Sequence, residues 1–337
     1  MDSKNFKDYK LGAKKSPIDE RDFKIKDLKA SISQVKEVLP EQFILEYKGV
    51  TKDQGAVSSC VANSLAYTRE ITETQQTGIY SQFSVGYIYS NRTPLMDSEE
   101  GMIPREAIQC LVDFGDVHYV DFPYDEDYPT VKARIDKDKS RLASLAYPNR
   151  ISSYYACDNV DDIKYALVHL GAVSVCLQIF PSFFDTPNNN SVASNAQWDK
   201  EECLGLHEVT IFGYNSTTKM LIVKNSWGKD WCTDSIFYLP FDTNLIQEAW
   251  ALTDKILPVP VQPSVYWRVQ VEANKLRENS KNTCEKLTKL GVDNCMIYEN
   301  GYFKVQVGSF TSTKYRDEKV NQLIALEYKP YIITMNK

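Results

Sequence analysis

Three short stretches, far apart along the chain, constrain the fold more than any other feature. They hold Cys60 in DQGAVSSCVAN, His207 in LHEVTIFGY and Asn225 in KNSWG. A thiol, an imidazole and an amide in this order form a nucleophile, a base and an orienting group only where the tertiary fold brings them together. The chain must therefore fold so that these three stretches meet.

The residues after Cys60 predict a helix that begins at the thiol. Residues 61–71 contain neither proline nor glycine, and Gly78 is a plausible stop. Cys60 would then lie in the first turn, where the positive end of the helix dipole favours a thiolate. The sequence thus provides an activated nucleophile.

The other two stretches and one short loop supply the partners of the thiol. His207 would accept its proton and later protonate the leaving amine. Asn225 would hold one imidazole nitrogen, and Trp227 would keep water away from that bond. Gln54 precedes Cys60 by a short loop, so its amide and the Cys60 N–H are natural donors for an oxyanion. We expect a cysteine hydrolase.

These motifs resemble the papain family of cysteine peptidases, in its bacterial branch. The resemblance covers about residues 16 to 255. It implies an α+β fold with two lobes, a helical lobe carrying Cys60 and a β-rich lobe carrying His207 and Asn225. It also implies that Gly101 and Met102 border the substrate, Gly101 by letting a backbone approach and Met102 by lining an apolar pocket. Trp227 completes the expected substrate-binding set.

Several positions depart from the family pattern. Val57 and Val61 stand where the family often has Cys and Trp, and Ser58 replaces a glycine. Glu208 follows the base where a small residue is usual. Strand alternation would turn Glu208 away from the face that carries His207, and we expect that arrangement.

The remaining histidines and cysteines give no sign of a metal or cofactor. His118 and His169 lie after and near the end of predicted helices, and we expect them to be structural. No His/Cys cluster has zinc spacing, so neither a metal site nor a cofactor is expected.

Composition excludes some partners. The net charge is −6 and the sequence pI is about 5.3, without a basic stripe, which argues against nucleic acid. No apolar run is long enough to span a membrane. The polar residues 1–10 lack a signal peptide's apolar region, so we expect cytoplasmic synthesis, with action at a cell wall after release left open. A monomer is expected.

The chain divides at a Pro-rich stretch. Residues 257–264 are expected to form a stiff linker. The predicted domains are an N-terminal extension (1–38), a peptidase domain (39–256), this linker and a C-terminal domain (265–337). Whether the extension inhibits the enzyme is left open.

An internal repeat predicts the C-terminal fold. YWRVQV, beginning at Tyr266, recurs as YFKVQV, beginning at Tyr302, and each copy precedes a helical pattern. The result is a β-α-β-β-α-β, ferredoxin-like domain with a four-stranded sheet.

This domain resembles the SPOR domain of bacterial cell-envelope proteins, over about residues 264 to 337. The resemblance implies binding of peptidoglycan glycan strands across the open sheet face. The residues expected there are Gln270, Tyr302, Gln306 and Ser309. Docking to the peptidase or to another protein is the alternative.

Two functions follow. The first is a cysteine peptidase of bacterial or phage type, acting on a peptide or protein, directed to the wall by its C-terminal domain and cutting wall peptides as a lysin does. The second is a catalytically silent papain-like scaffold in a binding protein. Retention of Gln54, Cys60, His207 and Asn225 together favours the enzyme.

Overall fold

The computed structural model describes residues 9–32, 38–91, 101–124, 128–254 and 265–336. The chain forms two compact units, of which the first comprises residues 1–15 and 24–258 and the second residues 16–23 and 259–337. The predicted linker, 257–264, lies outside the described residues. Residues 16–23 therefore belong with the C-terminal part of the chain, a grouping that the sequence did not indicate.

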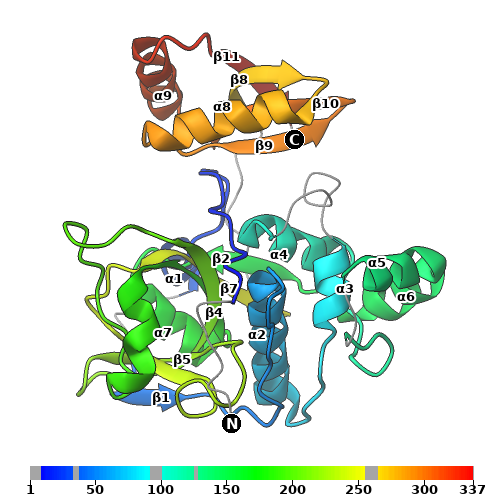
Figure 1. Ribbon diagram of the computed structural model, residues 1–337, viewed down its shortest axis with the longest axis vertical. Coiled ribbons are helices and arrows are strands. Elements are labelled where there is room, and N and C mark those ends of the chain that lie inside the picture. The colour runs from blue at the N-terminus through cyan, green and yellow to red at the C-terminus, as the bar shows by residue number, and fades with distance from the viewer. Residues whose placement is uncertain (1–8, 33–37, 92–100, 125–127, 255–264, 337) are drawn as a thin grey trace. The chain divides into compact units, whose positions relative to one another are not determined.

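The first unit consists of a helical lobe and a sheet, as predicted. Figure 1 shows α2 between the strands on one side and α3 to α6 on the other. The helices are α1 (Ile25–Ile32), α2 (Cys60–Thr77), α3 (Val85–Ser90), α4 (Pro104–Asp113), α5 (Tyr128–Lys137), α6 (Lys139–Ala146) and α7 (Val160–His169), with 3-10 helices η2 (Tyr147–Asn149) and η3 (Pro181–Asn188).

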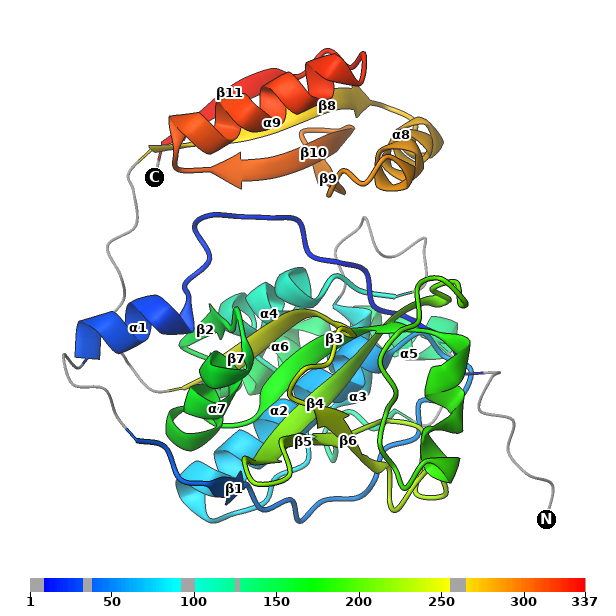
Figure 2. The same ribbon diagram turned by 90° about the vertical axis from the view of Figure 1, so that its left-hand side faces the viewer.

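The sheet of the first unit has seven strands. They are β1 (Gln42–Ile44), β2 (Ser153–Ala156), β3 (Val173–Ile179), β4 (Gly205–Asn215), β5 (Met220–Lys224), β6 (Ile236–Pro240) and β7 (Ile246–Thr253). Their order is β2-β7-β3-β4-β5-β6, and β1 also pairs with β4. Figure 2 shows the long strand β4 running across this sheet in front of α2. The strand that carries His207 is thus central, paired on both sides.

The helix predicted to begin at Cys60 is α2. It ends where Gly78 adopts a left-handed conformation, with φ of 75°, and donates its N–H to Thr74 O at 2.8 Å. Such a conformation is easiest for glycine, which has no Cβ. The end of α2 is therefore encoded locally.

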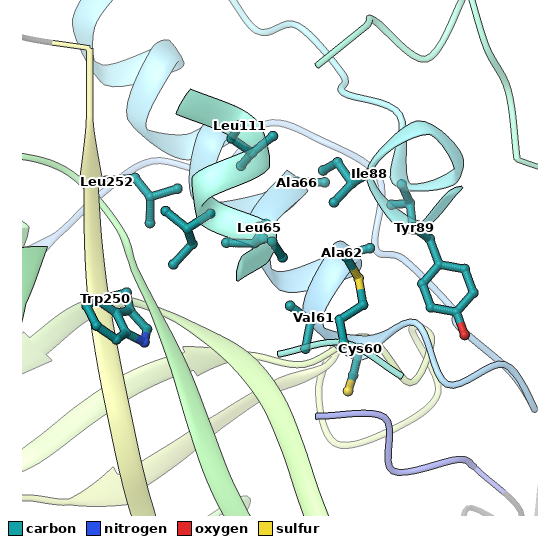
Figure 3. Packing of buried hydrophobic residues seen from close by; sticks show 14 of the residues in the cluster. Cys60, Val61, Ala62, Leu65, Ala66, Ile88, Tyr89, Leu111, Trp250 and Leu252 are labelled. Atoms are coloured by element: carbon teal, nitrogen blue, oxygen red, sulfur yellow. The ribbon is translucent and has the colours of Figure 1, made fainter. Parts of the chain in front are cut away.

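Buried apolar and hydroxyl side chains hold α2 in place. Figure 3 shows Val61, Leu65 and Ala66 of α2 packed between β7, which supplies Trp250 and Leu252, and α3. On the sheet side, Ser64 Oγ lies 2.8 Å from Val209 O and 2.9 Å from Thr210 Oγ1. These contacts fix the N-terminal end of α2 against β4, beside the residue pair 207–208.

The second unit has the predicted element order. Its elements are β8 (Val265–Asn274), α8 (Arg277–Lys289), β9 (Cys295–Glu299), β10 (Tyr302–Phe310), α9 (Thr313–Ala325) and β11 (Tyr331–Asn336). The strand order is β11-β8-β10-β9, and each pair is antiparallel. Both helices cover one face, where Val269, Leu287, Val305, Val307 and Leu323 form the core.

Candidate active site

The imidazole of His207 is oriented by Asn225, as the sequence predicts. His207 lies on β4, Asn225 follows β5, and His207 Nε2 is 2.7 Å from Asn225 Oδ1. That amide oxygen also accepts the Ser226 N–H at 2.8 Å, so it is held in place. If Nε2 carries the proton donated to Asn225, Nδ1 is the basic nitrogen. Within the described chain His207 Nδ1 has no hydrogen-bond partner, so it is the atom left to exchange a proton.

Trp227 covers this pair. Its ring is fully buried, and its centroid lies 4.9 Å from that of His207. Phe184 stacks on Trp227 at 5.6 Å. Trp227 therefore excludes water from the His207–Asn225 hydrogen bond, and its role toward substrate stays a prediction.

Cys60 lies at the start of α2 and meets β4. The backbone N–H of Glu208, the residue after the base, favours the charged form of the Cys60 thiol. The nucleophile therefore lies close to the part of β4 that follows the base. Cys60 is fully buried.

Gln54 is held in a fixed orientation. Ser226 Oγ donates to Gln54 Oε1 at 2.7 Å, and the Gln54 N–H donates to Ser226 O at 2.9 Å. Consequently Gln54 Nε2 points to the carbonyl oxygens of Val57, at 3.0 Å, and Lys10, at 2.9 Å. Ser226 is a positioning residue that the sequence reasoning did not single out, although it stands within the quoted KNSWG motif.

Residues 9–15, here called the covering segment, lie over these groups. The backbone N–H of Gly12 favours the charged form of the Cys60 thiol, and the Ala13 N–H donates to Leu206 O at 3.2 Å. The Tyr9 ring lies 5.6 Å from Trp227, and its hydroxyl donates to Asp53 at 2.8 Å. The sequence left the role of this extension open; the structure places part of it on the catalytic residues.

The two residues expected to border the substrate also contact the covering segment. Met102 donates its N–H to Gly12 O at 2.8 Å and accepts the Lys14 N–H at 2.9 Å. Gly101 has φ of 95°, and a Cβ there would lie 2.3 Å from Gly12 O. A backbone therefore approaches Gly101 closely, and in this structure it is the chain's own. Their role toward substrate stays a prediction.

Burial shifts the pKa values of both Cys60 and His207. It raises the pKa of Cys60 to about 12 and lowers the pKa of His207 to about 4, because both charged forms lose water. The N–H groups of Glu208 and Gly12 and the helix start favour a thiolate but do not outweigh burial here. Burial in this structure thus favours the neutral thiol and the neutral imidazole.

Glu208 points away from His207, as alternation predicts. Its Oε1 accepts from Ser174 Oγ of β3 at 2.8 Å, and its Oε2 has no partner in the described chain. Burial, with Glu248 as a second acid nearby, raises the pKa of Glu208 well above its usual range. Burial therefore favours the neutral form of Glu208, which lies on the α2 side of the sheet.

The other two histidines pack against aromatic rings, as expected of structural residues. His118 stacks on Phe83 at 5.1 Å, and His169, at the end of α7, lies 4.3 Å from the Tyr165 ring. Among the described residues no group of three or more His, Cys, Asp or Glu side chains could hold a metal ion. None of the described helices has the length and hydropathy of a membrane span.

Comparison with known proteins decides the family. Residues 41–251 match the model of the papain family of cysteine proteases, which is more than half of the chain. The chain belongs to the papain family of cysteine proteases. It is accordingly a cysteine-type peptidase, with Cys60, His207, Asn225 and Gln54 in the arrangement described above.

Relatives and solved structures agree with this assignment. An uncharacterized peptidase C1-like protein of Acanthamoeba polyphaga mimivirus is 28% identical over 224 residues, covering 61% of this chain and 70% of that protein. Xylellain, a cysteine protease from Xylella fastidiosa, has a TM-score of 0.60 at 22% identity and covers 73% of this chain and 96% of its own. The digestive procathepsin L 3 of Tenebrio molitor has a TM-score of 0.52 at 18% identity, with 69% and 76% covered. The structural likenesses show the papain-like α+β fold.

The four residues predicted to bind glycan share one sheet face but differ in exposure. Gln270 and Gln306 are direct partners in the β8–β10 register, and Gln306 Nε2 donates to Ser309 Oγ at 2.9 Å. Tyr302, in the β9–β10 hairpin, is 40% exposed, whereas Gln270, Gln306 and Ser309 are buried. Glycan binding by these residues stays a prediction, and only Tyr302 is accessible in this structure.

Proposed function

We propose that this protease is made in a latent form and hydrolyses peptide bonds once the covering segment leaves the catalytic residues. The observation that carries the proposal is the hydrogen bond from Gln54 Nε2 to Lys10 O at 2.9 Å, beside the Gly12 backbone that influences the Cys60 thiol. A substrate carbonyl group would have to lie beside the Cys60 thiol and accept a hydrogen bond from Gln54 Nε2. The covering segment and a substrate therefore exclude one another.

The chemistry then uses only residues of this chain. The Cys60 thiol gives its proton to His207 Nδ1, and the sulfur attacks the peptide carbonyl carbon. Gln54 Nε2 and the Cys60 N–H donate to the oxyanion. His207 returns the proton to the leaving amine, and water then hydrolyses the thioester with His207 again as base.

Hydrolysis of denatured casein tests both the latency and the peptidase activity. A chain lacking residues 1–15 should cleave casein faster than the full chain, and the same chain with Cys60→Ala should be inactive. Cys203→Ala, which removes an exposed cysteine, is the matched control and should keep activity. A silent scaffold would show no cleavage in any chain, and equal rates with and without residues 1–15 would refute latency.

We also propose that the second unit directs the protease to peptidoglycan, where it would cut wall peptides. The supports are the resemblance of residues 264–337 to SPOR domains, the β-α-β-β-α-β order and the exposed aromatic ring of Tyr302. Aromatic faces stack on sugar rings. A bacterial or phage origin, cytoplasmic synthesis with later release to the wall, and a monomeric state belong to the same proposal.

Sedimentation with purified sacculi stripped of stem peptides tests the wall proposal. Tyr302→Ala should weaken pelleting of the full chain. Tyr315→Ala should not, because Tyr315 is also exposed but lies on helix α9. Pelleting lost in moderate salt would indicate ionic adhesion instead. Failure of the wild-type chain to pellet, with intact casein cleavage, would refute wall targeting alone.

A further inference from the structure

The covering segment pairs with both lobes of the first unit at Ala13. On one side Met102 donates its N–H to Gly12 O at 2.8 Å and accepts the Lys14 N–H at 2.9 Å, and on the other the Ala13 N–H donates to Leu206 O at 3.2 Å. Ala13 thus bridges to Met102 in parallel and to Leu206 in antiparallel orientation. A peptide that took this place would find the same backbone partners, which is how strand addition binds an extended peptide.

The side chain of Ala13 points into the protein. It is buried and belongs to one cluster with Cys60, Met102, Cys176 and Trp250. Figure 3 shows Cys60 and Trp250 within this cluster. A residue in the place of Ala13 would therefore direct its side chain toward these groups, so this is a place where a substrate side chain can be selected.

Glu208 lies beside this cluster. It is directly opposite Cys176 in the β3–β4 register, and side chains of such partners lie about 5 Å apart on the same face. Leu206, two positions earlier on β4 and therefore on the same face, packs against the cluster. Glu208 is fully buried. Ser174 Oγ donates to its Oε1 at 2.8 Å, but its Oε2 has no hydrogen-bond partner among the described residues. Such an unsatisfied oxygen costs free energy, which a donor brought by a ligand would remove.

The charged surroundings of Glu208 are acidic. Glu248 of β7 is the partner of Cys176 on its other side, and its Oε2 accepts the Trp250 Nε1–H at 2.7 Å. Burial and the nearby Glu248 raise the pKa of Glu208, and the described groups that oppose them, Ser174 and Cys176, carry no positive charge. A lysine ammonium or an arginine guanidinium arriving with a substrate would supply both the missing donor and the opposite charge.

We propose that Glu208 is a specificity-determining residue that selects a lysine or arginine side chain at the substrate position replacing Ala13. The proposal rests on the function proposed above, because a substrate enters this place only when the covering segment leaves it. Ala13 is small and uncharged, so the covering segment leaves Glu208 Oε2 without a donor. A substrate with a basic residue gains an interaction that the covering segment lacks, and therefore competes with it best.

Substitution of Ala13 itself tests the contact in the full chain without requiring catalysis. Ala13→Lys places an amine beside Glu208, and Ala13→Met places an uncharged side chain of similar length there. Alkylation of Cys60 by iodoacetamide, followed by peptide mass spectrometry, measures how often the covering segment exposes the thiol. Ala13→Lys should be alkylated about tenfold more slowly than Ala13→Met, the effect of one hydrogen bond to a charged group.

Glu208→Gln keeps the shape of the side chain and removes its charge. In that background the two Ala13 variants should react at similar rates, whereas with Glu202→Gln, which changes an exposed acid, their difference should remain. Only the ratio of the two Ala13 variants is compared, so an effect of Glu208→Gln on folding or on the thiol itself cancels. Equal rates with Glu208 present, or a difference that survives Glu208→Gln, would overturn the proposal.

The bonds that the full chain cleaves in denatured casein test the selection of substrate. Mass spectrometry of the new peptide ends should show lysine or arginine enriched at one position near the cut, and Glu208→Gln should remove the enrichment. Cys60→Ala corrects for contaminating proteases. Cleavage without a basic preference would overturn the specificity and leave the peptidase function standing. If neither the full chain nor the chain lacking residues 1–15 cleaves casein, the peptidase function fails, and the selection of substrate fails with it.

Discussion

The side-chain amide of Gln54 donates a 2.9 Å hydrogen bond to the backbone carbonyl oxygen of Lys10. A peptide carbonyl of the chain itself thus occupies one of the two donors expected to bind the oxyanion. Ser226 Oγ fixes the amide in this orientation by donating to Gln54 Oε1 at 2.7 Å. Gln54 Nε2, the expected oxyanion donor, is therefore already oriented, and it is bound to the covering segment.

Loss of this donor should lower turnover strongly. In a chain lacking residues 1–15, Gln54→Ala should reduce kcat by about 10²–10³, the usual effect of removing one oxyanion-hole donor. Gln76→Ala, an exposed glutamine at the end of α2, should be neutral. Steady-state kinetics on a small fluorogenic peptide measures both. A negligible effect at Gln54 would mean that other groups hold the oxyanion.

The pH dependence of Cys60 alkylation should change when the covering segment is removed. Burial raises the pKa of Cys60 to about 12, and only the thiolate reacts, so in the full chain the rate should keep rising through the alkaline range. Removal of residues 1–15 lets water reach the thiol, which lowers its pKa and moves the profile to lower pH. Alkylation of exposed Cys203 in the same samples is an internal reference. Superimposable Cys60 profiles would contradict the burial argument.

Glu208 should make stability fall with rising pH. Its pKa is raised in the folded state, so the folded protein binds more protons than the unfolded chain. That contribution is fully present below the unfolded pKa, near 4.5, and is lost as pH rises toward the folded value. Glu208→Gln should therefore lose less stability than wild type as the pH rises above about 5. Urea unfolding at several pH values measures this, with exposed Glu202→Gln as control; parallel curves would disprove it.

The buried ion pair beneath the Gln54 loop should matter for folding. Lys52 Nζ lies 2.7 Å from Glu70 Oε1 of α2, with side-chain exposures of 6% and 0%. Glu70→Ala leaves a buried ammonium without its partner and should cost about 3–5 kcal/mol. Glu46→Ala breaks the exposed Lys48–Glu46 pair and should be near wild type. Thermal or urea unfolding would show whether the two variants differ; similar stabilities would refute the argument.

Local patterns predict the site well because each part has its own signal. The run after Cys60 without proline or glycine and the stop at Gly78 predict α2. The Asn225 and Trp227 positions follow from what an imidazole base needs. The repeat at Tyr266 and Tyr302 predicts the strands of the second unit.

The covering segment and residues 16–23 have no such signal. Gly12 looks like any loop glycine, and the covering segment is held by backbone hydrogen bonds between Gly12 and Met102 and between Ala13 and Leu206, which carry no side-chain pattern. Glu20 likewise has no sequence context that distinguishes it from the many other acidic residues. The sequence also did not predict the burial of Gln270 and Gln306. Period-two alternation assigns residues to a face of the sheet but does not say what covers that face.

The contact between Glu20 and Thr311 joins residues 291 positions apart. During synthesis residues 16–23 are therefore made long before the edge of β10 that pairs with them. At about 5–20 residues per second, the delay on the ribosome is roughly 15–60 s. Cys60 and His207 are both translated within that interval, so a chain that stops short of β10 would already contain the whole catalytic set without the surface that receives Glu20.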